Sequence, residues 1–343
     1  MNISFQFLCF SVAFFICSGF EIDGQTGGSC QPTNNTVAKT INVDWAGNGD
    51  FKNIQSAIDT VPAPNSQWIR ILVKAGNYSE KIKINASQSC IALEGEGMDK
   101  TFILWDDYAH DNISTVTSAT FTVRATDFVA RKISFQNTFP RNVPTQGVAV
   151  LVGGDRSAFY ECGFYGYQDT LADYKGRHYF KDCYIQGSSD FIYGEGQSIY
   201  ENCMLSVVPT PTANSNGYLA ITANGRESTT DGSGFIFKSC QVFGSRLVYL
   251  GRAWQKYSRV IFSKSNLTNV VAPEGWNSWS YGEDTQHIFY GEYENFGPSA
   301  DTSRRVNWMV HLNQSQNTLF TAIDFIDNEG WLTRQPSGTN FVV

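Results

Sequence analysis

A phrase that recurs between residues 159 and 203 constrains the fold more than any other feature of this sequence. It reads FYEC at residues 159–162, YFKDC at residues 179–183 and IYENC at residues 199–203, so its cysteine returns after 21 and then 20 residues. A repeat of this length, built from short β-type runs, is typical of a solenoid whose coils stack on one another. An antiparallel sandwich, the main structural alternative, would not explain near-identical phrases at a fixed period. We therefore predict an all-β solenoid.

The rest of the chain indicates a capped solenoid in one domain. Short apolar runs separated by Gly, Asn and Asp turns predict strands, the first of them at residues 40–43. Apolar residues at helical spacing in residues 51–61 predict a helix that stops at Pro62 and caps the open end of the coils. Weaker echoes of the phrase extend the coils to about residue 270. The Trp- and Tyr-rich remainder is expected to be an irregular tail, with a helical or strand-like segment at residues 320–326.

The N-terminal residues predict a targeting segment. Residues 3–20 carry no charge and are followed by polar, Gly-rich sequence. We interpret residues 1–19 as a cleaved secretory signal peptide and residues 20–38 as a loose leader. A retained membrane anchor is the alternative. No other stretch is long and apolar enough to span a bilayer, so a secreted protein without a membrane segment in its mature form is expected.

The charge balance bears on the class of partner. The chain has 25 Lys and Arg residues against 32 Asp and Glu residues, a net charge of −7. Binding to nucleic acid requires clustered Lys and Arg, so we expect no nucleic-acid partner. An acidic polymer could still be a substrate, but its binding would depend on cations placed locally at the site.

The cysteine content predicts disulfides. Removal of a signal peptide would leave six cysteines, and an even number in a secreted chain favours disulfide bonds. Stacked coils favour a pair between Cys162 and Cys183, with Cys203 and Cys240 as a further candidate pair. Zinc is the rival use of cysteine, but no CxxC pair occurs and we expect no metal. Sequons for N-glycosylation in the mature chain begin at Asn34, Asn77, Asn85, Asn112, Asn266 and Asn313.

Carboxylates and amides recur at the coil period, whereas common hydrolase motifs are missing from the sequence. There is no GxSxG, HExxH or Gly-rich phosphate loop. Asp169 and Asp190 lie 21 residues apart, which would place them roughly 5 Å apart on neighbouring coils. Two carboxylates 4 Å apart repel by about 4 kcal/mol at an effective dielectric constant of 20, or roughly three pKa units.

That repulsion predicts a division of labour between the two aspartates. One should stay protonated as a general acid while the other remains an anionic nucleophile or base. Gln146 and Gln168 fall on the same face of the stack and can donate to an oxyanion. Arg252 offers a cation to an aspartate, and Trp254 offers an indole face to a sugar ring. The plain alternative is that both aspartates only cap turns.

Five strings, in this order, resemble those of the plant pectin methylesterases. Two are close to GxYxE and QAVAL, at residues 76–80 and 146–150. The third is QDTL at residues 168–171, and the others are near DFIFG at residues 190–194 and LGRPW at residues 250–254. The match runs from about Lys39 to the C-terminus, so residues 39–343 are expected to form a pectinesterase catalytic domain. The resemblance is to the short form of the family, without an inhibitor-like pro-region.

The resemblance implies a right-handed parallel β-helix that removes methyl esters from homogalacturonan and releases methanol without a cofactor. It assigns Asp190 as nucleophile, Asp169 as general acid and base, and Gln168, joined by Gln146, as oxyanion stabiliser. The substrate-binding residues that it implies are Gln146, Arg252, Trp254 and Thr115. The pair Cys162–Cys183 also fits the family pattern. Methyl-esterified pectin is then the partner, a proteinaceous inhibitor a further one, and we expect a secreted monomer located in the cell wall.

Several positions depart from the family strings, and other functions compete. Gly147, Tyr193 and Ala253 replace Ala, Phe and Pro, and Ser188 with Ser189 stands where Thr-Val is usual. The catalytic side chains are intact, so we expect an active enzyme. A pectin-chain-cleaving β-helix enzyme is the nearest rival, although the NTD, GHG and RIK strings of those hydrolases are absent. A catalytically silent pectin-binding wall protein is the rival from another class.

Overall fold

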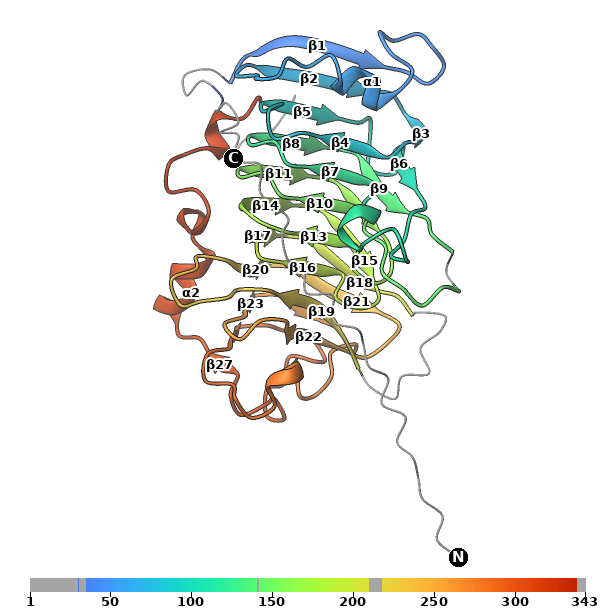
Figure 1. The fold of residues 1–343 in the computed structure, drawn as a ribbon. Coiled ribbons are helices and arrows are strands. Elements are labelled where there is room, and N and C mark those ends of the chain that lie inside the picture. Colours follow the sequence, from blue (N-terminus) through green and yellow to red (C-terminus); the bar gives the residue numbers. More distant parts are fainter. Residues whose placement is uncertain (1–29, 31–34, 141, 210–217, 338–343) are drawn as a thin grey trace, which may run out of the picture.

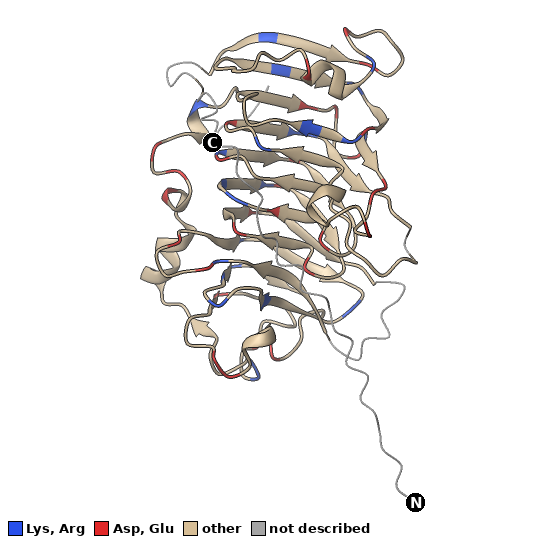
Figure 2. Cartoon of the chain, in the orientation of Figure 1, with Lys and Arg blue, Asp and Glu red and all other residues tan. Residues whose placement is uncertain are grey.

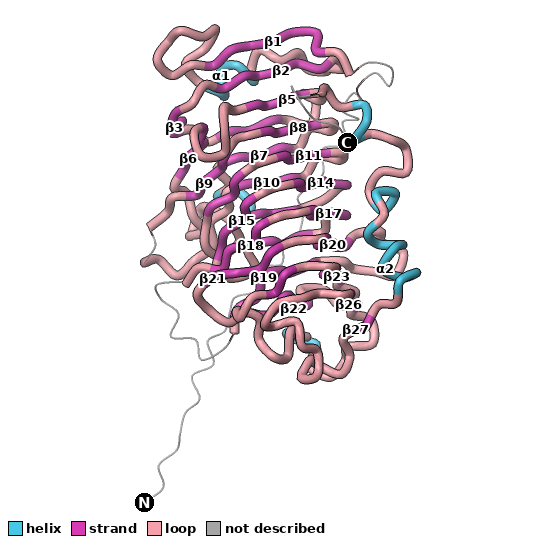
Figure 3. Tube along the Cα trace, turned by 180° about the vertical axis from the view of Figure 1, so that it is seen from behind, coloured by secondary structure: helices cyan, strands magenta, loops and turns pink. Residues whose placement is uncertain are grey.

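The computed structural model describes residue 30 and residues 35–140, 142–209 and 218–337. The expected signal peptide at residues 1–19 and the sequon at Asn34 lie outside these residues. The described chain winds into three parallel sheets that run the length of the molecule (Figures 1 and 3). The expected all-β fold, a right-handed parallel β-helix, is confirmed.

Most coils contribute one strand to each sheet, and strands pair with their counterparts on the neighbouring coils; sheet A has eleven strands among the described residues, and sheets B and C have eight each. Sheet A comprises β1 (Val37–Val43), β2 (Trp68–Val73), β5 (Ile91–Glu94), β8 (Phe128–Arg131), β11 (Ser157–Tyr160), β14 (Arg177–Lys181), β17 (Gln197–Glu201), β20 (Gly234–Lys238), β23 (Arg259–Ser263), β26 (Phe289–Tyr293) and β27 (Val310–His311). Sheet B comprises β3 (Gly76–Ser79), β6 (Thr101–Trp105), β9 (Ser134–Asn137), β12 (Gly163–Tyr165), β15 (Tyr184–Gly187), β18 (Met204–Val207), β21 (Gln241–Gly244) and β24 (Asn266–Leu267). Sheet C comprises β4 (Ile82–Ile84), β7 (Phe121–Val123), β10 (Val150–Val152), β13 (Leu171–Asp173), β16 (Ile192–Gly194), β19 (Leu219–Asn224), β22 (Val248–Ala253) and β25 (Trp276–Asn277).

The repeated phrase marks the turn from sheet A to sheet B. The residue before each of its cysteines has a left-handed backbone, with φ of 50° at Glu161, 55° at Asp182 and 55° at Asn202. Short polar residues such as Asp and Asn tolerate this region better than most. The amide of Asp182 donates to the carbonyl of Glu201 on the next coil (3.1 Å), which continues the ladder through the corner. The phrase therefore recurs because every coil must make the same corner.

An aromatic stack fills the core beneath sheet A. One ring from each of five successive coils lies almost parallel to the next, with centroids 4.4–5.1 Å apart and interplanar angles of 3–16°. The residues are Phe159, Phe180, Tyr200, Phe237 and Phe262. Each pair is also a register pair of adjoining strands. Side-chain stacking and backbone pairing therefore specify the same register.

The expected disulfide between Cys162 and Cys183 is not formed in the structure, and neither is the pair Cys203–Cys240. All four are buried free thiols. Because they occupy the same position on successive parallel coils, their side chains point the same way instead of converging. Each thiol finds a carbonyl instead: Cys183 donates to Phe159 (3.4 Å) on the preceding coil. The four cysteines thus behave as small core residues.

The disulfide that forms joins Cys30 to Cys90, whose pairing the sequence left open. It spans 60 residues and ties the leader to the coil that begins with β5. Asp127 lies beside the bridge, where it accepts from the amide of Cys30 (3.0 Å) and pairs with Arg156. The leader is therefore anchored at this point, which corrects the expectation of a wholly loose segment.

The extents of the N-terminal helix and of the last coils differ from those predicted from the sequence. The N-terminal helix α1 (Ile54–Ile58) is shorter than residues 51–61, although it buries the predicted apolar face against β1, β2 and β4. Pairing in sheet A continues past residue 270 through β26 and β27. The segment at residues 320–326 is helical, because it contains the end of α2 (Gln314–Thr321) and the 3-10 turn η3 (Ile323–Phe325).

The tail then runs back along sheet A to its last described residues (Figure 1). Trp331 and Leu332 at its end are buried against that sheet.

No helix among the described residues is long and apolar enough to cross a membrane. In Figure 2, residues of both charges are interspersed along the described coils. Binding of an acidic polymer would therefore depend on individual cations.

Truncating the aromatic stack should destabilise the fold strongly. For Phe180→Ala, which removes a fully buried ring between two stacked neighbours, we expect a loss of about 3–5 kcal/mol in the free energy of unfolding. Urea denaturation followed by circular dichroism measures it. The control is Phe296→Ala, because Phe296 is 57% exposed, and its loss should stay within about 0.5 kcal/mol. Equal losses in the two variants would contradict a core held by the stack.

Candidate active site

Asp169 and Asp190 occupy the same corner on neighbouring coils, where sheet B turns into sheet C. Both have a left-handed backbone, with φ of 64° and 46°, and each lies two residues before the first residue of its strand, β13 or β16. The amide of Asp169 donates to the carbonyl of Ser189 (3.1 Å), and Gln168 forms a parallel bridge with Ser189. The backbone ladder therefore fixes the two carboxylates as neighbours, as the 21-residue spacing predicts.

Arg252 reaches Asp190 from two coils further along. Its Nε donates to Oδ1 of Asp190 at 2.7 Å and its Nη2 donates to Oδ2, so the contact is bidentate. Between them stands Ala223, which pairs with Arg252 on one side and with Tyr193 on the other. A small side chain at this position leaves the guanidinium room to lie across the intervening coil.

The environments of the two carboxyl groups differ, although burial dominates both. Burial raises the pKa of Asp190, and the adjacent Arg252 guanidinium opposes that rise. Burial and the neighbouring charge of Asp190 together raise the pKa of Asp169 well above its ordinary value, and Arg252 opposes this less directly. Since only Asp190 holds the guanidinium in a bidentate pair, Asp169 is the carboxyl that keeps its proton as the pH rises.

Two exposed tryptophans flank the ion pair. The Arg252 guanidinium lies 3.6 Å from the ring centroid of Trp279, which is 44% exposed. Trp254 is 37% exposed and meets the ring of Tyr193 edge to face, with centroids 6.1 Å apart. Trp279 was missed from the sequence because it belongs to the aperiodic tail, in the 3-10 turn η2 (Trp279–Tyr281). The Trp- and Tyr-rich composition of that tail was its only signal.

The two glutamines stand one coil apart on the approach to Asp169. Gln146 and Gln168 form a parallel bridge, and both are half-buried. Gln146 Oε1 accepts from the hydroxyl of Thr145 (3.3 Å), which leaves its amide N–H groups as donors. A Cβ at Gly147 would lie 2.5 Å from the ring of Phe139, which accounts for glycine where the family strings have alanine.

Thr115 is the predicted site residue with the weakest link to this corner. It precedes the 3-10 turn η1 (Val116–Ser118), and its carbonyl accepts from the Ser118 hydroxyl (2.6 Å). Ser118 in turn accepts from the amide of Val148, close to Gln146 in the chain. Within the described part of the chain, no hydrogen bond joins Thr115 to either aspartate. The structure therefore connects Thr115 to the site through the backbone near Gln146.

Tyr193 carries a buried hydroxyl at this site. The residue is 7% exposed, and its hydroxyl has no hydrogen-bond partner among the described residues. Burial and the nearby Asp169 raise the pKa of the phenol well above its ordinary value, so it stays neutral. An unpartnered buried hydroxyl costs stability. Tyr193 therefore differs from phenylalanine in carrying a polar group for which the described residues provide no partner.

Comparison with known proteins gives one consistent family. A family model described as Pectinesterase matches residues 40–329. The chain is 45% identical over 303 residues to a protein named probable pectinesterase 29 from Arabidopsis thaliana, a match that covers 86% of this chain and 89% of that protein. It is 43% identical over 309 residues to probable pectinesterase 8 from the same organism, covering 88% and 78%.

Solved structures agree with the sequence relatives. The fold is similar to that of pectin methylesterase from carrot, with a TM-score of 0.83 and 31% identity over 90% of this chain and 99% of that one. It is also similar to a pectin methylesterase solved in complex with a hexasaccharide, with a TM-score of 0.75 and 25% identity over 85% and 98% of the two chains.

The raised pKa of Asp169 predicts a pH-dependent stability. A carboxyl whose pKa is higher in the folded protein stabilises the fold fully below the unfolded pKa, and this contribution is lost as the pH rises through the folded pKa. Asp169→Asn keeps the shape and cannot ionise. Wild type should therefore lose stability relative to Asp169→Asn as the pH rises above about 4. Urea denaturation at a series of pH values measures this.

The matched control is Asp182→Asn, because Asp182 has the same left-handed backbone at a corner of sheet A. A stability difference between wild type and Asp169→Asn that did not change with pH would contradict the assignment.

Removing the Tyr193 hydroxyl should stabilise the free protein. Tyr193→Phe deletes a buried donor without a partner in the described chain, and we expect a gain of about 1 kcal/mol in the free energy of unfolding. Thermal or urea denaturation measures it. Tyr290→Phe is the control with the opposite sign, since Tyr290 is buried and its hydroxyl bonds to Ser258 at 2.7 Å. A loss of stability in Tyr193→Phe would show that its hydroxyl has a partner.

Proposed function

Because this chain belongs to the pectinesterase family and is a carboxylic ester hydrolase, we propose that it demethylates homogalacturonan through Asp190, Asp169 and the two glutamines. One observation carries the assignment of roles. Two neighbouring carboxylates lie in the same corner of adjoining coils, and only Asp190 is held by a bidentate guanidinium. The catalytic unit is proposed to span residues 39–343.

In the first half of the reaction, an ionised Asp190 oxygen attacks the carbonyl carbon of the methyl ester. The carbonyl π electrons move onto its oxygen, and the amide N–H groups of Gln168 and Gln146 donate to the resulting oxyanion. Collapse of the tetrahedral intermediate breaks the bond to methoxide, which takes the proton of Asp169 and leaves as methanol. An anhydride then links Asp190 to the uronate.

In the second half, Asp169 is a carboxylate and acts as a base. It takes a proton from a water molecule, whose oxygen attacks the uronate carbonyl of the anhydride. The bond to the Asp190 oxygen breaks, and the pair of electrons returns to Asp190 as a carboxylate. The uronate leaves as a free acid, and Asp169 is protonated again. Both aspartates are thereby restored, and one water is consumed for each methanol released.

Arg252 and the tryptophans prepare this reaction. The guanidinium favours the ionised form of Asp190, which must be the nucleophile, and it orients both carboxylate oxygens. Trp254 and Trp279 are exposed on the same side as the ion pair and offer flat apolar faces to sugar rings. Thr115 is proposed to contact the substrate from the neighbouring turn.

The cellular setting is also a proposal. We expect secretion into the cell wall and glycosylation at some of the sequons. Asn77, Asn85, Asn112 and Asn313 are exposed, whereas Asn266 is half-buried. We propose a proteinaceous inhibitor that covers the site as a further partner, and we expect the protein to act as a monomer.

Replacing the nucleophile should abolish turnover. For Asp190→Asn, which keeps the shape but removes the charge, we expect methanol release from methylated pectin to fall on the order of 10⁴-fold. Asp182→Asn serves as the control, since it changes a similar left-handed corner away from the site. Undiminished release by Asp190→Asn would refute the assigned nucleophile. New reducing ends without methanol would instead indicate a chain-cleaving enzyme, and pectin binding without either product would indicate a silent binding protein.

A further inference from the structure

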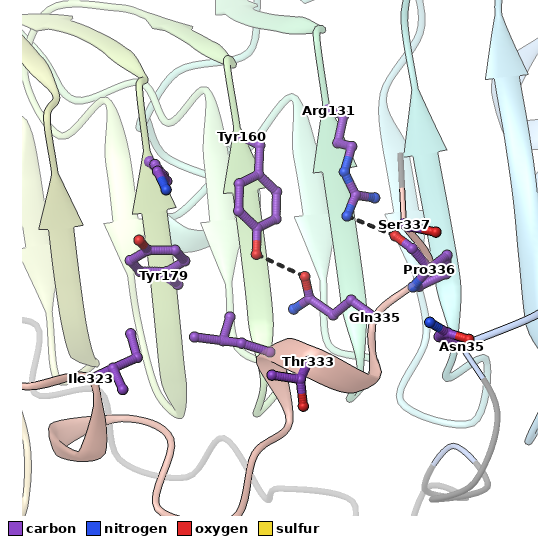
Figure 4. Close-up of a pocket in the computed structure, with 11 residues that line it drawn as sticks. Asn35, Arg131, Tyr160, Tyr179, Ile323, Thr333, Gln335, Pro336 and Ser337 are labelled. Carbon is purple, nitrogen blue, oxygen red and sulfur yellow. Dashed lines mark hydrogen bonds between the residues drawn. The ribbon is translucent and has the colours of Figure 1, made fainter. Parts of the chain in front are cut away.

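A second pocket lies between sheet A and the C-terminal tail, away from the aspartates (Figure 4). Its volume is about 240 Å³. One wall is the outer face of sheet A, with Arg131 from β8, Tyr160 from β11, and Tyr179 and Lys181 from β14. The other wall is the tail around Gln335. The pocket is therefore closed by two segments that lie far apart in the sequence.

Two buried donors in this pocket have no acceptor. Arg131 is 5% exposed; its Nη2 donates to the carbonyl of Pro336 (2.9 Å), but its Nε has no partner among the described residues. Gln335 is 6% exposed; its Oε1 accepts from the Tyr160 hydroxyl (2.8 Å), but its Nε2 is likewise without a partner there. In Figure 4 the Arg131 guanidinium extends toward Pro336, whereas the Gln335 amide extends toward Tyr160. Leaving such groups unpaired is costly, so two in one pocket call for an explanation.

The pocket is also positively charged. Elsewhere in the described chain, the buried guanidinium of Arg305 pairs with the carboxylate of Glu292 (2.7 Å), whereas that of Arg226 donates to backbone carbonyls. Arg131 forms no ion pair with a described carboxylate within 4 Å, and neither does Lys181. No Asp or Glu is among the residues that line the pocket. Burial lowers the pKa of the Arg131 guanidinium, but an arginine side chain stays protonated in a protein, so Arg131 remains a cation. In a chain of net charge −7, such a pocket selects for an anion.

The shape of the pocket restricts that anion to a small ring. The rings of Tyr160 and Tyr179 meet edge to face, with centroids 5.9 Å apart, and provide an aromatic wall. The volume of about 240 Å³ lies just below the range typical of drug-sized ligands. Thr333 at the rim is exposed, so the space opens to solvent. A monosaccharide unit therefore matches the pocket better than a longer segment.

We propose that this pocket binds the carboxylate of one uronate unit at the end of a demethylated pectin chain. This inference rests on the proposed function, because that reaction produces such units. A flat carboxylate can pair with the Arg131 guanidinium and with Lys181, which both line the pocket, while the sugar ring packs against the tyrosines. A methyl-esterified unit carries no charge and would not pair with these two cations. The pocket thus distinguishes product from substrate and retains the enzyme on chains that it has already demethylated.

Calorimetric titration with D-galacturonate tests the proposal on the full-length protein. The methyl ester of D-galacturonic acid and D-galactose are the neutral probes. Lys181→Met removes one cation of the pocket, and Arg131→Met removes the buried one. Lys238→Met is the matched control, because Lys238 lies two coils further along sheet A at the same strand position, outside the pocket. Arg252→Ala removes the cation of the catalytic site, so that binding there is separated from binding in the pocket.

We expect galacturonate to bind wild type, Lys238→Met and Arg252→Ala alike, and both neutral sugars to bind at least about tenfold more weakly. Lys181→Met and Arg131→Met should weaken galacturonate binding by about tenfold or more, whereas Lys181→Met should release methanol from highly methylated pectin at the wild-type rate. Binding that is lost in Arg252→Ala and kept in Lys181→Met would overturn the proposal, and so would equal binding of the charged and neutral sugars. Methanol release by wild type reports on the proposed function separately.

Discussion

The structure depends on the in-register hydrogen bonding of each coil to the next. Every strand in the three sheets pairs in parallel with its counterpart on the neighbouring coil, and even the corners continue the ladder through amides such as those of Asp182 and Asp190. A register fixed in this way copies each side-chain position from one coil to the next. The aromatic stack in the core and the pair of aspartates at the surface are two results of the same copying.

Copying alone would give two equivalent carboxylates, and equivalent carboxylates could not divide the proposed roles of acid and nucleophile. The asymmetry comes from Arg252, which reaches one aspartate across the small Ala223 and leaves the other without a cation of its own. Burial raises the pKa of both carboxyls, and the charge of Asp190 raises the pKa of Asp169 further. One guanidinium thereby converts a structural repeat into a site with a proton on one side only.

Much of this could be predicted from the sequence, because short-range periodicity carries it. The period of the FYEC phrase predicts the coils, and the same period predicts that Asp169 and Asp190 are neighbours. The cysteine prediction was wrong for the reason that made the fold prediction right: residues at one position on parallel coils run side by side and do not converge. The site position of Trp279 and the pocket at Arg131 could not be predicted, because both depend on how the aperiodic tail folds back onto the coils. In the pocket, the tail contacts coils that lie more than a hundred residues earlier in the sequence.

We infer that the two copied carboxylates hold different protonation states in the free protein. A neutron crystal structure in heavy water at mildly acidic pH would show the deuterons directly. We expect a deuteron on the carboxyl of Asp169 and none on Asp190, with both Asp190 oxygens accepting from Arg252. A deuteron on Asp190, or two carboxylates without a deuteron, would refute this inference.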